Sequence, residues 1–478
     1  MSGLKWVTIS RVLGQVLTWV NTFIVIRLIS PTDFGLSALA GLFANFLLLL
    51  SELGFSVALV QRQTRDEESL RNVFGALLAI GTGFSLALVL AAPIIGTFFK
   101  EPRLVPLIRL VSVQFLAISF GVIPQARLSM DLRFKELAII GTIASLISAA
   151  TTLIIALNGG GAWSLIIGIV VLSVSRTILL NLYCPSLRAP QLQLSKIRHL
   201  AGFSGLVLLE RTLWYWYMQI DSFVVGRSLG AAQLGIYAVG RQLTNIPLER
   251  AMEIINSIAL PAFSLVKHDL DQVRRGYLKV LRLGAGYAFP VFWGLALVSE
   301  PLVRLVLGVR WVSSALVIQV LCISMPLRML NSFTSSAVTA LARQDVNIKS
   351  LVLAMVLIPC CVIGGSHWGV VGVAAGWAVG FPIVYLFNAS LVRHALEISI
   401  AQMLLAVWPS VAASAVMCTV TGLLNVLILN TVPPAVHVAI AVPFGALVYV
   451  GTLWIVSRRS VREMLEFAKG FVTQGQGA

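Results

Sequence analysis

The stretch RLISPTDFGLSALA, Arg27–Ala40, recurs in altered form as RSLGAAQLGIYAVG, Arg227–Gly240. The second copy lies 200 residues after the first (227 − 27) without a gap, so Arg27 and Gly35 align with Arg227 and Gly235. Upstream of the stretch the identities continue as Arg11/Arg211, Leu13/Leu213, Phe23/Phe223 and Val25/Val225. Polar residues align with polar residues, which apolar helices seldom show by chance. The pattern indicates that the chain arose by duplication.

The composition is that of a membrane protein. Hydrophobic residues make up 58% of the chain and charged residues 11%, whereas a soluble domain carries about a quarter charged residues. Apolar runs of about 20 residues recur from end to end, each long enough to cross the hydrocarbon core as a helix. The sequence therefore predicts an all-α polytopic membrane protein with about 14 transmembrane helices. The first span is expected to be an uncleaved anchor, because MSGLKWVTISR contains no small-residue cleavage site.

The repeat divides the chain into segments. Six expected spans, an even number, separate the two copies, so both copies have the same orientation in the membrane. We expect two six-helix lobes at residues 1–184 and 200–395, joined by a linker at residues 185–199. A further helix pair follows at residues 396–458, and a tail at residues 459–478. Transporters of this layout bind substrate between the lobes and open to the two sides alternately.

The basic residues orient the array. Most of the 35 Lys and Arg residues lie in connections on one side of the expected membrane, which predicts a multi-pass protein with both termini in the cytoplasm. The net charge of +16 reflects this asymmetry and favours contact with anionic membrane lipid. The basic residues are scattered over many short loops, so nucleic acid is not an expected partner.

Some charged residues lie inside the expected spans, where they are costly. They share helical faces with other polar residues, for example Arg11 with Thr18 and Thr22, and these faces are expected to line a water-filled cleft between the lobes. An alternative is that polar side chains join helices within one lobe. The neighbours Glu210–Arg211 and Glu249–Arg250 could be structural ion pairs, and Arg176 and Arg328 could extend to the membrane surface instead.

The seventh span contains four consecutive aromatic residues in LWYWYMQ, Leu213–Gln219. Such residues often form a belt at the membrane surface. Two of them, with Trp214 beside the polar face, could instead stack against sugar rings.

No catalytic constellation is visible. The sequence contains no Walker A, HExxH or outer-loop DxD motif, and its five His residues are far apart. The five Cys residues form no CxxC pair, so neither a disulfide framework nor a metal site is predicted. The sequence predicts a transporter rather than an enzyme, with no cofactor, driven by an ion gradient, the membrane potential or the gradient of its substrate.

Two segments carry a resemblance to a known family. VIRLISPTDFGLSALAGLFANFLLLLSELGFSVALVQRQ, residues 25–63, resembles the opening of the polysaccharide transporter (Wzx-like) family, lipid-linked oligosaccharide flippases of the multidrug/oligosaccharidyl-lipid/polysaccharide exporter superfamily. QIDSFVVGRSLGAAQLGIYAVGRQLTNIPLERAMEIINSIALPAFS, residues 219–264, is similar to the start of that family's second lobe. The resemblance is to the exopolysaccharide branch, of the colanic-acid type, and covers roughly residues 1–400.

The resemblance implies a flippase of the bacterial inner membrane that moves undecaprenyl-diphosphate-linked repeat units from the cytoplasmic to the periplasmic leaflet, for exopolysaccharide or lipopolysaccharide assembly. The implied partners are the lipid-linked oligosaccharide and the polymerase and assembly machinery. A diphosphate needs fixed cations, and arginine suits bidentate contact with phosphate. The substrate-binding candidates, chosen by helical face, are Arg11, Arg211, Trp214, Arg241, Arg250 and Arg328.

Acidic residues in the spans could bind a coupling proton or sodium ion. The candidates are Glu52, Asp221 and Glu249, of which Glu52 has no basic residue within one turn of its own helix. Two other functions stay open. A drug or cation antiporter of the same superfamily would favour an acidic cleft, and a polysaccharide polymerase or ligase would require a large periplasmic loop.

Overall fold

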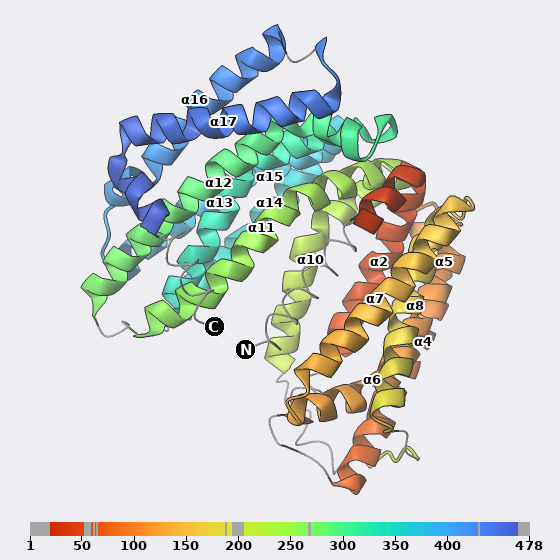
Figure 1. Cartoon of the computed structure of the whole chain (residues 1–478). Helices are drawn as coiled ribbons and strands as arrows, with labels where there is room; N and C mark the ends of the chain where they lie inside the picture. The colour runs from red at the N-terminus through yellow and green to blue at the C-terminus, as the bar shows by residue number, and fades with distance from the viewer. Residues whose placement is uncertain are drawn as a thin grey trace. The chain divides into compact units, whose positions relative to one another are not determined.

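The computed structural model contains helices and no strand over the residues that it describes (Figure 1). These are residues 20–51, 59–60, 63, 66–186, 189–193, 205–265, 269–341, 343–428 and 431–466, with side chains described except at 205–207 and 253–265. The α-helices are α2 (Pro31–Ser51), α4 (Glu67–Phe98), α5 (Leu104–Val111), α6 (Val113–Met130), α7 (Phe134–Leu157), α8 (Ala162–Tyr183), α10 (Gly205–Ser228), α11 (Ala231–Leu265), α12 (Leu270–Val306), α13 (Ser314–Ala340), α14 (Gln344–Gly365), α15 (Gly369–Leu396), α16 (Ile400–Leu427) and α17 (Pro434–Val456).

The all-α polytopic fold predicted from hydropathy is confirmed. Ten helical stretches in the described part of the chain are long and apolar enough to cross a membrane, and one of them, Gln344–Leu396, contains both α14 and α15. Helices α10 and α11 are not among the ten, and each carries four charged residues. Helix α12 carries seven, but they lie near its two ends, within residues 271–282 and 300–304, and leave an apolar middle.

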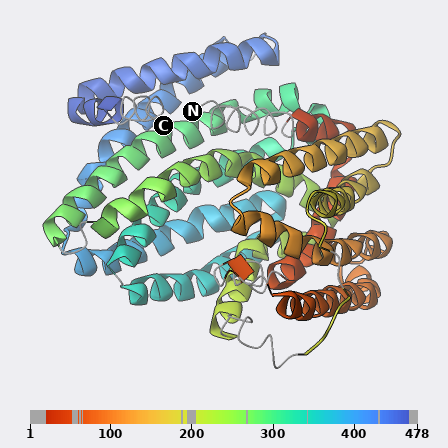
Figure 2. The same ribbon diagram turned by 60° about the horizontal axis from the view of Figure 1, so that its bottom comes forward.

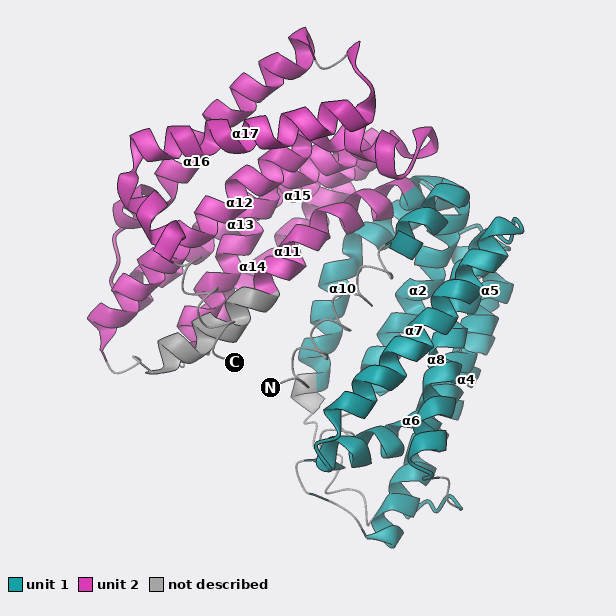
Figure 3. Cartoon of the chain, viewed as in Figure 1, with its two compact units in different colours: residues 1–235 teal, residues 236–478 magenta. Residues whose placement is uncertain are grey.

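Two compact units divide the chain, at residues 1–235 and 236–478 (Figure 3). In the first unit α2 packs against α10 and α5, and α8 packs against α6 and α7. In the second unit α12 packs against α13, and α15 packs against both α13 and α14. The division into two lobes and a linker that the repeat suggests stays a prediction.

The two copies of the repeated stretch begin their helices by different local chemistry. In the first copy Pro31 occupies the first turn of α2, where its missing N–H costs nothing. The Ser30 hydroxyl accepts from the Asp33 backbone N–H at 3.1 Å and donates to the Asp33 carboxylate at 2.6 Å. In the second copy Gly230, with φ of 85°, precedes α11, a backbone conformation that glycine adopts without strain.

Within residues 1–235 the two copies contact each other reciprocally. A Cβ added at Gly35 would overlap the Ala231 carbonyl oxygen and lie 2.9 Å from the Gly235 nitrogen. A Cβ added at Gly235 would overlap the Pro31 carbonyl oxygen and lie 3.1 Å from the Gly35 nitrogen. Gly35 contacts Ala231, and Gly235 contacts Pro31, which occupies the same position in the first copy as Ala231 does in the second. Such a reciprocal contact is the symmetry that a duplication produces. The repeat keeps glycine here because the α2 and α11 backbones touch.

A strap of extended chain crosses α4. The Gln191 backbone N–H donates to the Arg71 carbonyl at 3.1 Å, and the Gln193 N–H donates to Asn72 Oδ1 at 2.9 Å. A Cβ at Gly75 would overlap the Gln191 carbonyl oxygen. The described part of the expected linker is therefore fixed to the first unit.

The C-terminal pair α16–α17 belongs to the second unit and packs along α12, as Figures 1 and 2 both show. The Tyr449 hydroxyl donates to the Gly286 carbonyl at 2.9 Å. Beyond α17, Glu463 accepts from Arg282 of α12 at 2.8 Å and from Arg459 at 2.9 Å. Near the other end of the pair, Asn425 donates to the Leu297 carbonyl and bonds His437 at 3.1 Å. The pair is thus joined to α12 at both of its ends.

The reciprocal glycine contact leads to a stability prediction. Gly35→Ala and Gly235→Ala should each lower the melting temperature of the purified protein, because overpacking at a closed contact costs about 1–3 kcal/mol. The double variant should lose less than the two single losses together, since one displacement of the helices relieves both overlaps. Gly83→Ala on α4, where an added Cβ meets nothing within 4 Å, is the control and should melt no lower than the parent. Equal melting temperatures for Gly35→Ala and Gly83→Ala would contradict the close approach.

Candidate functional site

The residues proposed from the sequence fall on three helices. Arg211, Trp214 and Asp221 lie on α10 in the first unit, and Arg241, Glu249 and Arg250 lie on α11 in the second. Arg328 lies on α13, also in the second unit. Arg11 and Glu52 lie outside the described residues.

The α10 candidates differ in exposure. Arg211 is exposed, and Trp214 retains 48% of its surface. Asp221 is buried at 2% exposure, and its Oδ1 accepts from the Ser222 backbone N–H at 2.7 Å. The exposed end of α10 thus carries the guanidinium and the indole, while the carboxylate lies deeper in the packed part of the helix.

The aromatic run of α10 fixes this helix against α2. The Tyr215 hydroxyl donates to the Leu42 carbonyl of α2, and the Trp216 ring lies 5.3 Å from the Phe46 ring and 6.2 Å from the Phe43 ring. The Trp214 ring lies 5.6 Å from the tilted ring of Tyr217 on its own helix and remains about half exposed. Packing accounts for Tyr215 and Trp216, and Trp214 is the member left available for contact with a ligand.

Arg227, the basic residue of the second repeat copy, has an aromatic neighbour. Its guanidinium carbon lies 5.0 Å from the centre of the Phe98 ring, at the end of α4. Phe98 and its neighbour Phe99 also contact Phe223 on α10. This arginine therefore helps to attach the end of α10 to the rest of the first unit.

On α11 the candidates follow the predicted polar face. Arg241 and Arg250 are partly buried, and Glu249 is exposed. The same helix approaches α13, where the Ser332 hydroxyl contacts the Met252 sulfur at 3.0 Å. The polar faces of α11 and α13 are therefore neighbours within the second unit.

Arg328 on α13 is held by aromatic rings. Its guanidinium carbon lies 4.7 Å from the Trp377 ring centre and 5.9 Å from the Phe381 ring centre, both on α15. One turn along α13, Asn331 accepts from the amide of Asn388, a residue of α15 with 2% exposure. Stacking holds the guanidinium in a fixed plane, which favours directional contact with an anion.

Trp377 and Asn388 were not among the residues selected from the sequence. Asn388 was detectable as an amide inside an apolar run, which is costly unless it is hydrogen-bonded. Trp377 gave no such signal, because a tryptophan in a membrane helix is ordinary.

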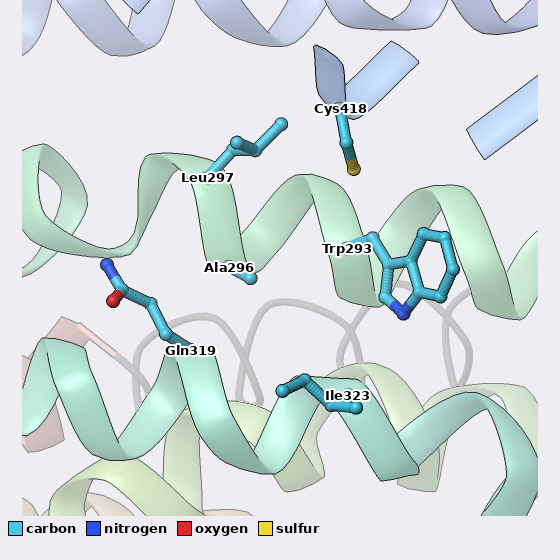
Figure 4. A pocket seen from close by; sticks show the side chains of 6 residues that line it. All are labelled: Trp293, Ala296, Leu297, Gln319, Ile323 and Cys418. Atoms are coloured by element: carbon cyan, nitrogen blue, oxygen red, sulfur yellow. The ribbon is translucent and has the colours of Figure 1, made fainter. Parts of the chain in front are cut away.

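A cavity of about 440 Å³ opens between α12, α13 and α16 of the second unit (Figure 4). Its lining residues are Trp293, Ala296, Leu297, Gln319, Ile323 and Cys418. The one amide among them, Gln319, donates to the Ser299 hydroxyl at 3.1 Å. This lining is mostly apolar and contains no cationic residue, so it suits a hydrocarbon chain better than an anionic headgroup. Among the described residues no group of three or more His, Cys, Asp or Glu could hold a metal ion.

Comparison with known proteins gives consistent matches. A family described as polysaccharide biosynthesis protein matches residues 24–316. The lipopolysaccharide biosynthesis protein WzxC of Escherichia coli (strain K12) is 28% identical over 416 residues, which are 85% of this chain and 84% of that protein. The succinoglycan biosynthesis transport protein ExoT of Rhizobium meliloti (strain 1021) is 26% identical over 67% of this chain and 65% of its own.

The fold also matches a solved structure. The lipid II flippase MurJ, in an inward closed conformation, superposes with a TM-score of 0.73 over 95% of this chain and 99% of its own, at 16% sequence identity. At that identity the match concerns the fold.

The stacking of Arg328 on Trp377 is open to measurement. In a double-mutant cycle with Arg328→Leu and Trp377→Leu, we expect a coupling of about 0.5–2 kcal/mol in the stability of the purified protein. The control pair is Arg458 and Trp454, whose guanidinium-to-ring distance is a similar 4.8 Å but whose side chains are both exposed. The control coupling should be the smaller, because solvent weakens the attraction. A larger coupling in the control pair would show that Arg328 is not held by the ring.

Proposed function

The chain belongs to the family of polysaccharide biosynthesis proteins that it matches over residues 24–316, and from this premise we propose that it is a flippase for lipid-linked oligosaccharides. It would carry undecaprenyl-diphosphate-linked repeat units from the cytoplasmic to the periplasmic leaflet for exopolysaccharide or lipopolysaccharide assembly. It is a transport protein of the membrane and not an enzyme, in keeping with relatives named as a transport protein and a flippase.

The observation that carries the proposal is the presence of arginines within α10 and α11. These two helices carry Arg211, Arg241 and Arg250 within segments of spanning length. Ionisable residues inside spans are rare, and they commonly mark the pathway of a substrate or ion. A diphosphate on a lipid carrier supplies an anion, and the guanidinium fork matches its oxygens.

The connections between helices disfavour a polymerase or ligase. Short connections join the helices on the side proposed to face the periplasm. They are residues 99–103 (α4 to α5), 158–161 (α7 to α8), 307–313 (α12 to α13), 366–368 (α14 to α15) and 428–433 (α16 to α17). Each is too short to form a domain that could bind a second sugar chain. The same family membership disfavours the drug antiporter as the first choice.

The coupling of transport is part of the proposal. Glu52, Asp221 and Glu249 are the candidates for binding a proton or sodium ion, and Asp221 is the most buried of the two that are described. The polymerase and assembly machinery would take up the product on the outer side.

The function is tested by following lipid-linked repeat units in cells. Loss of the gene should make these intermediates accumulate in the cytoplasmic leaflet, and the parent gene should restore export. Arg211→Ala should fail to restore it while still inserting in the membrane, and Arg211→Lys should restore it in part, because lysine keeps the charge but not the fork. Normal export without the gene would refute the proposed function, whereas normal export by Arg211→Ala would refute only the role of this residue.

The proposed orientation is tested by labelling single cysteines in a variant that lacks the five native ones. Cysteines at Asn158 and Thr431, both exposed, should react with an impermeant maleimide added outside the cell. Cysteines at Gln193 and Gln272, also exposed, should react only after the membrane is opened. Labelling from outside at position 193 would show that the orientation is the reverse of the one proposed, and would contradict the proposed direction of transport.

A further inference from the structure

Arg176 is the single charged residue of α8 and lies in the last third of that helix (Ala162–Tyr183). At about 1.5 Å per residue, its Cα is about 10 Å along the axis from that of Tyr183. Its side chain is exposed. On its helical face Ile169, Leu172 and Tyr183 are exposed as well, whereas Leu180 is buried. The guanidinium thus projects from an apolar surface inside a spanning helix.

Arg176 has a neutral partner where other arginines have acids. Its Nη2 donates to Gln125 Oε1 on α6 at 3.3 Å, and no carboxylate lies within ion-pair distance among the residues that the structure describes. By contrast, Arg133 pairs with Glu136 and Arg282 with Glu463. Since a guanidinium has five N–H donors, most of its donors are left for a ligand.

The polar contacts of α6 and α8 show where the guanidinium lies along the membrane normal. The Thr177 hydroxyl donates to the Ala117 carbonyl, and the Asn181 amide donates to the Phe120 carbonyl, so the two helices run in the same direction. Gln125 is farther toward the α6 end at Met130 than either of these acceptors. The Arg176 side chain therefore extends toward the ends of α6 and α8 that the proposed orientation places in the cytoplasm. In the proposed orientation this direction leads toward the phosphates of cytoplasmic-leaflet lipids.

We propose that Arg176, held by Gln125, binds the phosphate groups of the lipid-linked substrate as it enters from the cytoplasmic leaflet, an assignment that rests on the flippase function proposed above. Exposure on an apolar face gives access to a headgroup whose hydrocarbon chain stays in the bilayer. The neutral partner orients the guanidinium without neutralising it. Arg176 would act before the arginines of α10 and α11, which lie on other helices.

A snorkelling arginine is the simpler explanation, and the two differ in what lysine can replace. Snorkelling requires a long stem and a charge, which lysine supplies equally well. Bidentate contact with phosphate requires the planar fork, so lysine should bind less tightly than arginine. Replacing Gln125, whose amide orients the guanidinium, should change phosphate binding only if Arg176 itself binds the phosphate.

The test uses the purified full-length protein in phosphatidylcholine nanodiscs, with farnesyl diphosphate as the probe. Arg176→Ala should weaken binding by about tenfold or more, as expected for the loss of charge-assisted hydrogen bonds. Arg176→Lys should lie between Ala and the parent, and Gln125→Ala should weaken binding a few-fold. Arg304→Ala, which removes an exposed arginine paired with Glu300 at the opposite end of the spans, should bind as the parent does. Unchanged melting temperatures would show that each variant is folded.

Three outcomes would overturn the assignment. These are parental affinity in Arg176→Ala, parental affinity in Arg176→Lys, and loss of the difference between parent and Arg176→Ala when phosphatidylglycerol is added to the nanodiscs. The last would mean that an ordinary anionic lipid occupies the site. Failure of the proposed function is a separate result. In that case the probe would still bind through Arg176, but the protein would move no lipid-linked oligosaccharide in cells.

Discussion

Hydrocarbon offers no hydrogen-bond partner to a backbone amide, and this constraint governs the structure from its secondary structure to its charged residues. It requires helices in every crossing segment, since a helix satisfies its own backbone groups. It also removes most of the hydrophobic drive for helices to associate, because lipid tails are as apolar as leucine. Packing must then come from close backbone approach and from side-chain hydrogen bonds. The glycines at positions 35 and 235 allow the close approach. Thr177 and Asn181 of α8 supply side-chain hydrogen bonds to backbone carbonyls of α6.

The same constraint explains why the fold could be read from the sequence and the site only in part. Length and hydropathy decide the spans, so the all-α polytopic class follows from composition. The alignment of Gly35 with Gly235 was visible in the sequence, but their mutual contact was not, because alignment gives equivalence and not distance. Arg328 was found by the helical face of α13, whereas the Trp377 ring that orients it lies on another helix and looks like an ordinary membrane residue. Sequence periodicity reports one helix at a time, and a site is made by several.

The arginines of the two units differ in the kind of group that contacts the guanidinium, which indicates different roles. Arg227 and Arg328 are stacked on rings, Arg282 is paired with Glu463, and Arg176 is held by an amide. A ring or an amide orients a guanidinium while leaving its charge in place, and a carboxylate neutralises it. The type of partner therefore separates Arg282, whose charge a carboxylate neutralises, from Arg176, whose charge its amide partner leaves in place. By this criterion Arg282 is structural.

The contact between Arg282 and Glu463 has a consequence for the synthesis of the chain. Ribosomes make the protein from its N-terminus, so α12 enters the membrane before residue 463 has been translated. In that interval Arg282 lacks its carboxylate, and the Gly286 surface, later covered by Tyr449 and Met464, stays open. A truncated chain would keep this surface open, and open polar surface within a membrane is what quality-control proteases act on. Closure of the α12 contact thus requires that translation has passed residue 464.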